Sequence, residues 1–169
     1  MTDTLYRRPT WVRVRLVNPL LRAMVLRAGL GRRGEQNVMR VLRVRGRRSG
    51  REYEVPLRIA IWEGKRYVVS LQGEAEWARN LRAAGTAQLL VGTNVEPIVG
   101  HEIRGEEKVA FLHWYCRQPA HRLSVRAGLK VNPANPTPAD IDRLVRQHPI
   151  FRLDPAGAPG PGNPADTSR

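Results

Sequence analysis

The stretch YEVPLRIAIWEGKRYVVSL, residues 53–71, decides the fold. Apolar and polar side chains alternate from Tyr53 to Ile61, which is the period-two pattern of a strand with one buried face. Pro56 interrupts this strand and favours an edge or a bulge, because proline has no N–H to donate to a neighbouring strand. The turn at 63–65 leads into a second strand over 66–71, so the stretch predicts a β-hairpin.

The flanking sequence adds further strands and helices. We predict strands over 38–44, 86–91, 95–103 and 149–153, and a helix over 75–84 with Trp77, Leu81 and Ala84 on its buried stripe. A second helix is expected after Gly105, with Val109, Leu112 and Cys116 facing inward, and a third is expected to begin with Thr137 as its N-cap. Strands with few intervening helices predict a mostly β (α+β) fold built on a small barrel.

Composition divides the 169 residues into three parts. Residues 1–36 form an N-terminal basic region, residues 37–153 form the barrel domain, and the Pro/Gly-rich residues 154–169 are expected to be a disordered tail. Within the first part, residues 11–30 contain a short basic amphipathic helix. This helix either lies on an anionic membrane surface or packs on its own barrel, and the sequence leaves both alternatives open.

The charge balance favours anionic partners. The chain has 29 Lys+Arg against 15 Asp+Glu, a formal net charge of +14. Nucleic acid fits the same electrostatics, but no recognition helix or zinc module is recognisable, so we do not expect it as the partner. Cys116 is the single cysteine, which indicates a reducing, cytoplasmic setting. His113, Cys116 and His121 lack the spacing of a zinc site, and we predict no metal.

The loop Gly46-Arg47-Arg48-Ser49-Gly50-Arg51 carries the clearest chemistry. Its guanidinium groups and serine hydroxyl are donors for a phosphate, and its glycines permit backbone N–H groups to converge. An ordinary charged hairpin loop is the alternative. Gly73 lies where a strand gives way to a helix, so a ligand can approach the backbone closely there, and Trp77 either covers a flat ring or belongs to the core.

Five stretches together resemble one family: 46–51, Val55-Pro56-Leu57, 66–70, Gly73-Glu74 and 77–85. They are similar to the deazaflavin-dependent nitroreductase and quinone reductase family, whose members adopt a split β-barrel and bind coenzyme F420. The resemblance spans about residues 38–153. It implies that the phosphate of the coenzyme lies at Arg47, Arg48, Ser49 and Gly50, that Pro56 lies beside the coenzyme, that Ser70, Leu71, Gln72 and Gly73 lie against the deazaflavin ring, and that Trp77 and Asn80 form or support the pocket wall.

The resemblance also implies a reaction. Reduced coenzyme F420 would give a hydride to a quinone, a nitroaromatic or a similar electron-poor acceptor, with Trp114 and Tyr115 as the aromatic residues on the acceptor side. The cofactor carries this chemistry, so no catalytic side chain is predicted. The alternatives are a non-catalytic barrel that binds flavin mononucleotide (FMN) or lipid, and a basic nucleic-acid-binding domain. We expect a cytoplasmic protein, with peripheral contact at the inner membrane face through residues 11–30 as a further prediction.

Overall fold

The structure is a computed structural model that describes residues 37–91 and 94–157. Its strands are β1 Asn37–Arg45, β2 Glu52–Trp62, β3 Lys65–Val69, β4 Thr86–Val91, β5 Asn94–Glu102 and β6 Ile150–Pro155. Its helices are α2 Glu76–Ala84, α3 Gly105–Arg117 and α4 Pro138–Gln147, with a 3-10 turn at Pro119–His121 and a π-helix at Ser124–Leu129. The predicted helix within residues 11–30 and most of the predicted tail lie outside the described residues.

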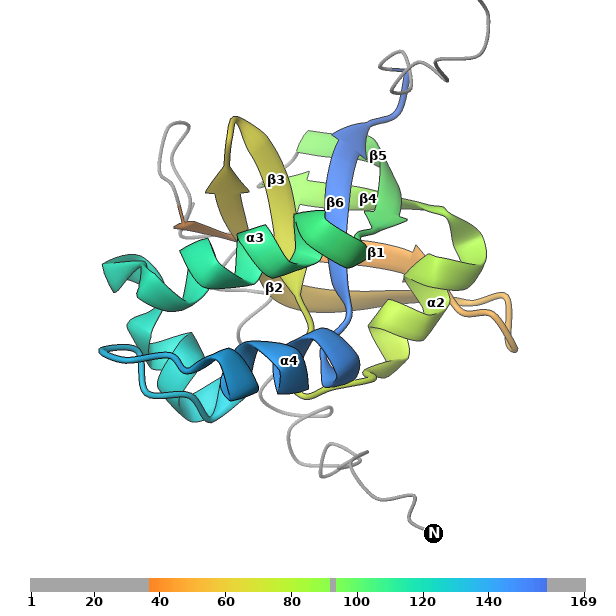
Figure 1. The fold of residues 1–169 in the computed structure, drawn as a ribbon. Helices are drawn as coiled ribbons and strands as arrows, with labels where there is room; N and C mark the ends of the chain where they lie inside the picture. The colour runs from red at the N-terminus through yellow and green to blue at the C-terminus, as the bar shows by residue number, and fades with distance from the viewer. Residues whose placement is uncertain (1–36, 92–93, 158–169) are drawn as a thin grey trace, which may run out of the picture.

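The strands form a closed barrel in the order β1-β2-β3-β6-β5-β4, with every neighbouring pair antiparallel (Figure 1). The barrel closes where β1 pairs with β4 as well as β2, so that Val41 lies opposite both Pro56 and Leu90. The predicted fold class, a mostly β barrel with helices, is confirmed.

The strand β2 pairs with β1 along most of its length and with β3 only at its end. It pairs with β1 from Glu52 to Ala60, but β3 joins its other side only from Ile59 onward. Pro56 therefore lies on a segment whose second edge is unpaired within the described residues. The edge position expected for this proline is confirmed, as is usual for a residue that has no N–H to donate.

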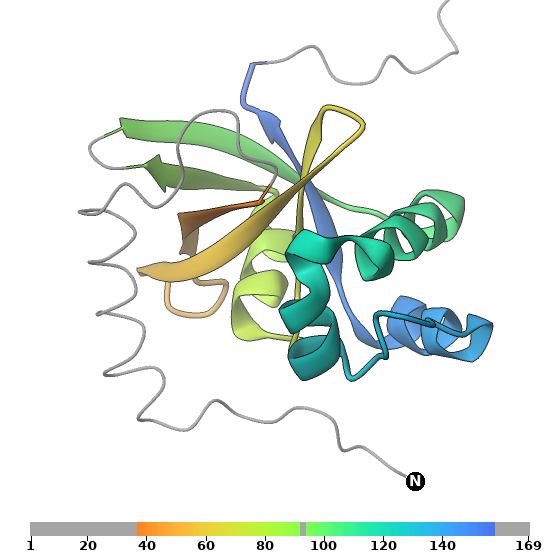
Figure 2. The same ribbon diagram turned by 90° about the vertical axis from the view of Figure 1, so that its left-hand side faces the viewer.

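Most buried apolar residues form two cores separated by the barrel wall, and Val41 and Leu90 form a third, small cluster with Met39. The inner core fills the barrel and includes Leu42, Ile59, Val68, Leu81, Ile98 and Phe151. The outer core lies between the barrel and the helices α3 and α4 and includes Tyr67, Val69, Phe111, Leu112, Tyr115 and Leu144. Figure 2 shows α3 and α4 on one side of the barrel, and α2 at one end, where its Ala78 and Leu81 join the inner core.

The outer core corrects the prediction that β2 buries only one face. Ala60 and Trp62 point to the other face and are covered there, with the Trp62 ring 5.6 Å from the ring of Phe111. The alternation of apolar and polar residues identifies the face of β2 that points into the barrel. It does not show that a helix covers the outer face.

Two predicted helix faces also need correction. Val109 is 36% exposed, because the buried stripe of α3 follows Lys108, Phe111, Leu112, Tyr115 and Cys116, one position away. Ala84 is exposed at the last turn of α2, where the helix leaves the barrel. The predicted ends hold: Gly85 closes α2 with φ +69°, and Thr137 begins α4 with a capping box to Asp140. None of the helices in the described ranges is long and apolar enough to cross a membrane.

Candidate functional site

The loop between β1 and β2 is closed by its own backbone. The Gly46 N–H donates to the Arg51 carbonyl at 2.8 Å, and the Gly50 N–H donates to the Gly46 carbonyl at 2.9 Å. Gly50 has φ +68°, a conformation that favours glycine. Both glycine amides are therefore engaged within the loop, and the donors that remain for a ligand are mainly side chains.

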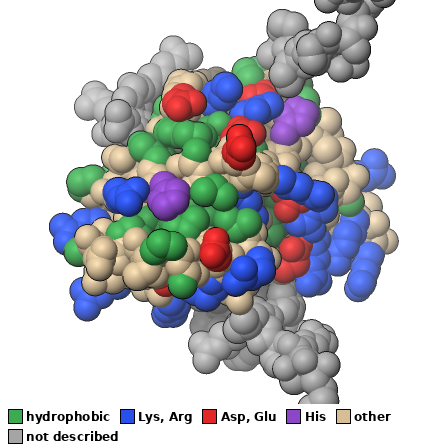
Figure 3. Space-filling model, viewed as in Figure 1, with side chains coloured by type: hydrophobic (Ala, Val, Ile, Leu, Met, Phe, Trp, Pro, Cys, Tyr) green, Lys and Arg blue, Asp and Glu red, His purple; other side chains and the backbone are tan. Residues whose placement is uncertain are grey.

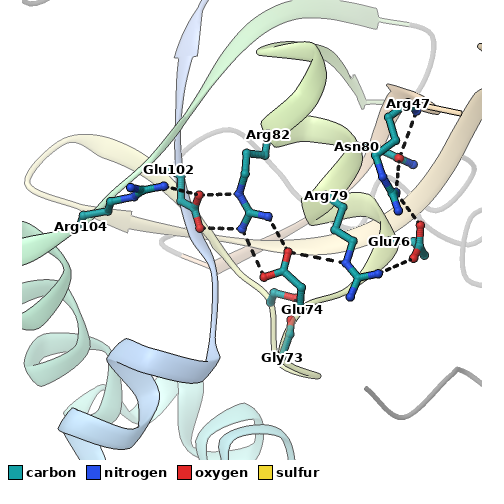
Figure 4. A network of polar contacts seen from close by, with 10 residues as sticks. Arg47, Gly73, Glu74, Glu76, Arg79, Asn80, Arg82, Glu102 and Arg104 are labelled. Carbon is teal, nitrogen blue, oxygen red and sulfur yellow. Dashed lines mark hydrogen bonds and ion pairs between the residues drawn. The ribbon is translucent and has the colours of Figure 1, made fainter. Parts of the chain in front are cut away.

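Arg47 fixes this loop to α2 (Figure 4). Its backbone N–H and its Nη1 both donate to Asn80 Oδ1, at 3.2 and 3.0 Å, and Nη1 also lies 2.7 Å from Glu76 Oε2. Asn80 is only 6% exposed. The hydrogen bond from Arg47 is the largest cause of the lowered pKa of the Glu76 carboxyl. Loop and helix, thirty residues apart in sequence, thus form one unit.

The opposite side of the loop is open. Ser49 Oγ and Tyr53 OH lie 3.1 Å apart, and the Arg51 N–H donates to Ser49 Oγ at 3.3 Å. Arg48 and Arg51 are exposed, and neither guanidinium forms an ion pair with an acidic residue in the ranges 37–91 and 94–157. Figure 3 shows Lys and Arg side chains gathered at the right of the view, over α2 and this loop.

The turn after β3 is fixed by hydrogen bonds from several directions. The Ser70 N–H donates to the Pro149 carbonyl at 2.9 Å, His148 Nδ1 donates to the Ser70 carbonyl at 2.8 Å, and Ser70 Oγ donates to the Gly73 carbonyl. Gly73 has φ +72°. Burial lowers the pKa of His148, so the imidazole is neutral at pH 7 and donates from Nδ1. The backbone at 70–73 is consequently held rigid.

A network of ion pairs ties this turn to β5 (Figure 4). Arg82 contacts Glu74 at 2.6 Å and Glu102 at 2.7 Å. The hydrogen bond from Arg82 is the largest cause of the lowered pKa of Glu102. Each of these side chains is partly exposed, so the network stabilises the arrangement modestly and serves mainly to orient it.

The predicted acceptor residues lie in the outer core. The ring of Tyr115 stacks on His121 with a centroid distance of 4.1 Å and an interplanar angle of 14°, and Trp114 approaches both rings. Burial raises the pKa of Tyr115 to about 12 and lowers that of His121 to about 4. Leu71 packs against the same core and lies beside Gly128, whose added Cβ would meet the Leu71 Cβ at 3.1 Å.

The structure thus brings most of the predicted residues into two neighbouring groups. The first joins the loop 46–50 to Asn80, and the second joins Leu71 to Trp114 and Tyr115, with the turn 70–73 leading from one to the other. Trp77 packs on Phe151, with the ring centroids 5.9 Å apart, and belongs to the inner core. Gln72 is exposed, and Pro56 lies on the unpaired edge of β2.

Sequence reasoning missed several residues that shape these groups. The alternating pattern identifies Tyr53 only as a strand residue, although it follows the loop by two positions. No local pattern shows that Glu76 meets Arg47 or that His148 meets Ser70. The described residues contain no group of three His, Cys, Asp or Glu side chains placed to hold a metal ion.

The protein is a closed antiparallel β-barrel whose cationic loop is docked on a helix. The sequence profile of the F420H(2)-dependent quinone reductase family matches residues 11–127. The chain belongs to this family, so it is an oxidoreductase and coenzyme F420 is its cofactor. Among curated proteins, no sequence matches.

Several solved structures are similar to this chain. An F420-H2 dependent reductase (FDR-A) is 23% identical, with 69% of this chain and 93% of that chain covered and a TM-score of 0.45. The protein Atu2129, of unknown function, from Agrobacterium tumefaciens is 14% identical, with coverage of 92% and 60% and a TM-score of 0.46. The conserved hypothetical protein Rv2991 from Mycobacterium tuberculosis is 13% identical, with coverage of 77% and 86% and a TM-score of 0.43.

Proposed function

We propose that this protein reduces a quinone, a nitroaromatic or a similar electron-poor acceptor with the hydride of reduced coenzyme F420. The observation that carries the proposal is the joining of the loop 46–51 to α2 through Arg47 and Asn80, beside the rigid turn at 70–73. The family supports the cofactor and the quinone acceptor. The nitro acceptors and the positions of both molecules are part of the proposal.

The donor set of the loop fits a phosphate. Arg48 and Arg51 supply guanidinium groups that no acidic side chain occupies in the described ranges, and Ser49 adds a hydroxyl. Charge-assisted hydrogen bonds of this kind are the strong ones in proteins. In the proposed complex Arg48 and Ser49 contact the phosphate of the coenzyme, while Arg47 and Gly50 shape the loop that presents them.

The ring of the coenzyme is proposed to lie along the backbone of Ser70, Leu71, Gln72 and Gly73, with Pro56 beside it and with Trp77 and Asn80 supporting the wall. When bound, the reduced coenzyme supplies the hydride. Ser70 donates to the carbonyls of Pro149 and Gly73 and accepts from His148 Nδ1, and these hydrogen bonds keep this backbone in one position, so little ordering remains to be done on binding.

The acceptor is proposed to lie on the side of Trp114 and Tyr115. Leu71 packs in the same apolar core as Tyr115, which supports placing the acceptor next to the ring position at 70–73. Because its pKa is raised to about 12, Tyr115 keeps its proton at neutral pH and remains a hydrogen-bond donor. The apolar residues around it exclude water.

Binding and turnover of the purified protein test the proposal. Fluorescence titration with coenzyme F420 is expected to show saturable binding, and Arg48→Ala is expected to weaken it by about tenfold, as for a charge-assisted contact. Arg117→Ala, which removes an exposed arginine from the end of α3, is the matched control. Oxidation of the reduced coenzyme is then followed with a quinone or a nitroaromatic as acceptor.

Competing ligands separate the alternatives. Saturable uptake of FMN in place of F420 would support a flavin-loaded barrel. Binding of a short random DNA that falls steeply with salt, without uptake of F420, would support nucleic-acid binding instead. Oxidation of the reduced coenzyme by the quinone but not by the nitroaromatic would restrict the acceptor to quinones.

A further inference from the structure

The loop 46–51 is divided into an anchored side and an open side. Arg47 is held by Asn80 and Glu76 through its backbone and its guanidinium, and its side chain is only 21% exposed. A ligand that bound the Arg47 guanidinium would have to break its 2.7 Å ion pair with Glu76. Arg48 and Arg51 form no ion pair with a described acidic residue, although the charge of Arg48 contributes to the lowered pKa of Glu76, so a ligand can bind their guanidinium groups without breaking an ion pair.

Tyr53 belongs to this open side. Tyr53 is 49% exposed, which is unusual for a large ring among the described residues, and its hydroxyl lies 3.1 Å from Ser49 Oγ. Its ring also explains Gly46, because a Cβ there would clash with Tyr53 Cε2 and would lie 2.8 Å from Ser49 Oγ. Glycine at position 46 therefore lets the tyrosine ring lie against the loop.

The two hydroxyls leave one proton for a ligand. Ser49 Oγ already accepts the Arg51 N–H at 3.3 Å. Of the two hydroxyl protons of Ser49 and Tyr53, one is used in the hydrogen bond between them, in either direction. The other proton is not used within the pair and can be donated to a ligand.

We propose that Tyr53 is a further coenzyme-binding residue, which acts with Ser49 as a single hydroxyl donor to a phosphate oxygen. Arg48 and Arg51 supply the charge on either side of this donor, and Arg47 is a positioning residue that holds the loop on α2. The inference rests on the proposed function for the identity of the ligand, but the anion site itself is defined by the loop.

Substitutions of the hydroxyl pair test the proposal. Tyr53→Phe removes the hydroxyl and keeps the ring over Gly46, so the loop and the thermal midpoint of unfolding should not change. We expect coenzyme F420 to bind about tenfold more weakly, the equivalent of one hydrogen bond to a charged group. Because the pair acts as one donor, Ser49→Ala with Tyr53→Phe should cost little more than either change alone.

The salt dependence of binding separates the role of the Arg48 charge from the role of the Tyr53 hydroxyl. Arg48→Ala should reduce the salt dependence of binding, whereas Tyr53→Phe should weaken binding without changing that dependence, since no charge is lost. Equal affinity of wild type and Tyr53→Phe for F420 would overturn the role of Tyr53 and leave the proposed function intact. Fully additive losses in the double variant would overturn the shared donor.

Inorganic phosphate provides a second readout that does not depend on the coenzyme. We expect phosphate to shift the amide NMR signals of Ser49 and Arg51 in the wild type, and to shift them less in Tyr53→Phe. If wild type takes up phosphate at these residues but not F420, the anion site stands and the proposed function fails. If neither ligand affects the loop, the anion site is overturned.

Discussion

His121 should make the stability of this protein fall as the pH drops below 6.5. It lies between α3 and the π-helix with 1% of its surface exposed, stacked on Tyr115. Its Nδ1 is buried and has no hydrogen-bond partner among the described residues. Burial is the larger cause that lowers its pKa to about 4, and the charge of Arg58 adds to it.

The direction of this pH dependence is set by how many protons the folded and unfolded chains bind. An unfolded histidine titrates near 6.5, so between about pH 6.5 and 4 the unfolded chain binds a proton that the folded protein excludes. Stability is complete above the unfolded pKa and is lost as the pH falls toward the folded pKa. At 1.36 kcal/mol per pH unit, the loss is about 2 kcal/mol by pH 5 and about 3 kcal/mol in full.

Urea unfolding at pH 7, 6 and 5 measures this loss. His121→Phe keeps an aromatic ring against Tyr115 and removes the titration, so the loss between pH 7 and 5 should shrink by about 2 kcal/mol. His148 also has a lowered pKa, so the variant should keep part of the slope. His101→Gln controls for the removal of a histidine. The same slope in wild type and His121→Phe would refute the reasoning.

Three further substitutions test the packing of the site and its frame. Asn80→Ala leaves the Arg47 amide without its acceptor, so it should lower the free energy of unfolding in urea by about 1–3 kcal/mol and weaken F420 binding in the same titration. Gly100→Ala would place a Cβ 2.8 Å from the side chain of Leu81, which is buried in the barrel, and should lower the free energy of unfolding by about 1–3 kcal/mol. An unchanged thermal midpoint would mean that α2 shifts to make room without loss of stability. Thr137→Ala removes the cap of α4 and should cost about 1 kcal/mol in urea unfolding, with the exposed Ala134→Gly as a control outside the helix.

Sequence patterns predicted the elements that depend on local chemistry. The strands of the barrel, the glycine that ends α2 and the threonine that begins α4 follow from periodicity and capping, which neighbouring residues determine. Val109 was misplaced because α3 buries Lys108, whose Nζ donates to the Val145 carbonyl at 2.8 Å. A buried lysine with a backbone partner on another helix leaves no trace in an apolar pattern.

In the candidate site, too, the sequence predicts the features that depend on neighbouring residues and misses the contacts between distant ones. The loop 46–51 was identified from its glycines and arginines, but its sequence gives each arginine the same weight. Only the contact with α2 distinguishes Arg47, which is bound by Asn80 and Glu76, from Arg48, which is not. The partners of Ser70 likewise lie far away in the sequence: they are His148 and Pro149, the two residues between α4 and β6.

The difference between arginines that are ion-paired and arginines that are not determines how a chain with a net charge of +14 selects a ligand. Around α2, the carboxylates of Glu74, Glu76 and Glu102 pair with Arg47, Arg79 and Arg82, which neutralises much of the positive charge beside the loop. Total charge speeds the approach of any anion. Specific binding requires guanidinium groups that a ligand can take without breaking an existing ion pair, and Arg48 and Arg51 meet this condition next to the hydroxyls of Ser49 and Tyr53. A phosphate group fits these donors, whereas a long polyanion that extended along α2 would also meet the carboxylates of Glu74, Glu76 and Glu102.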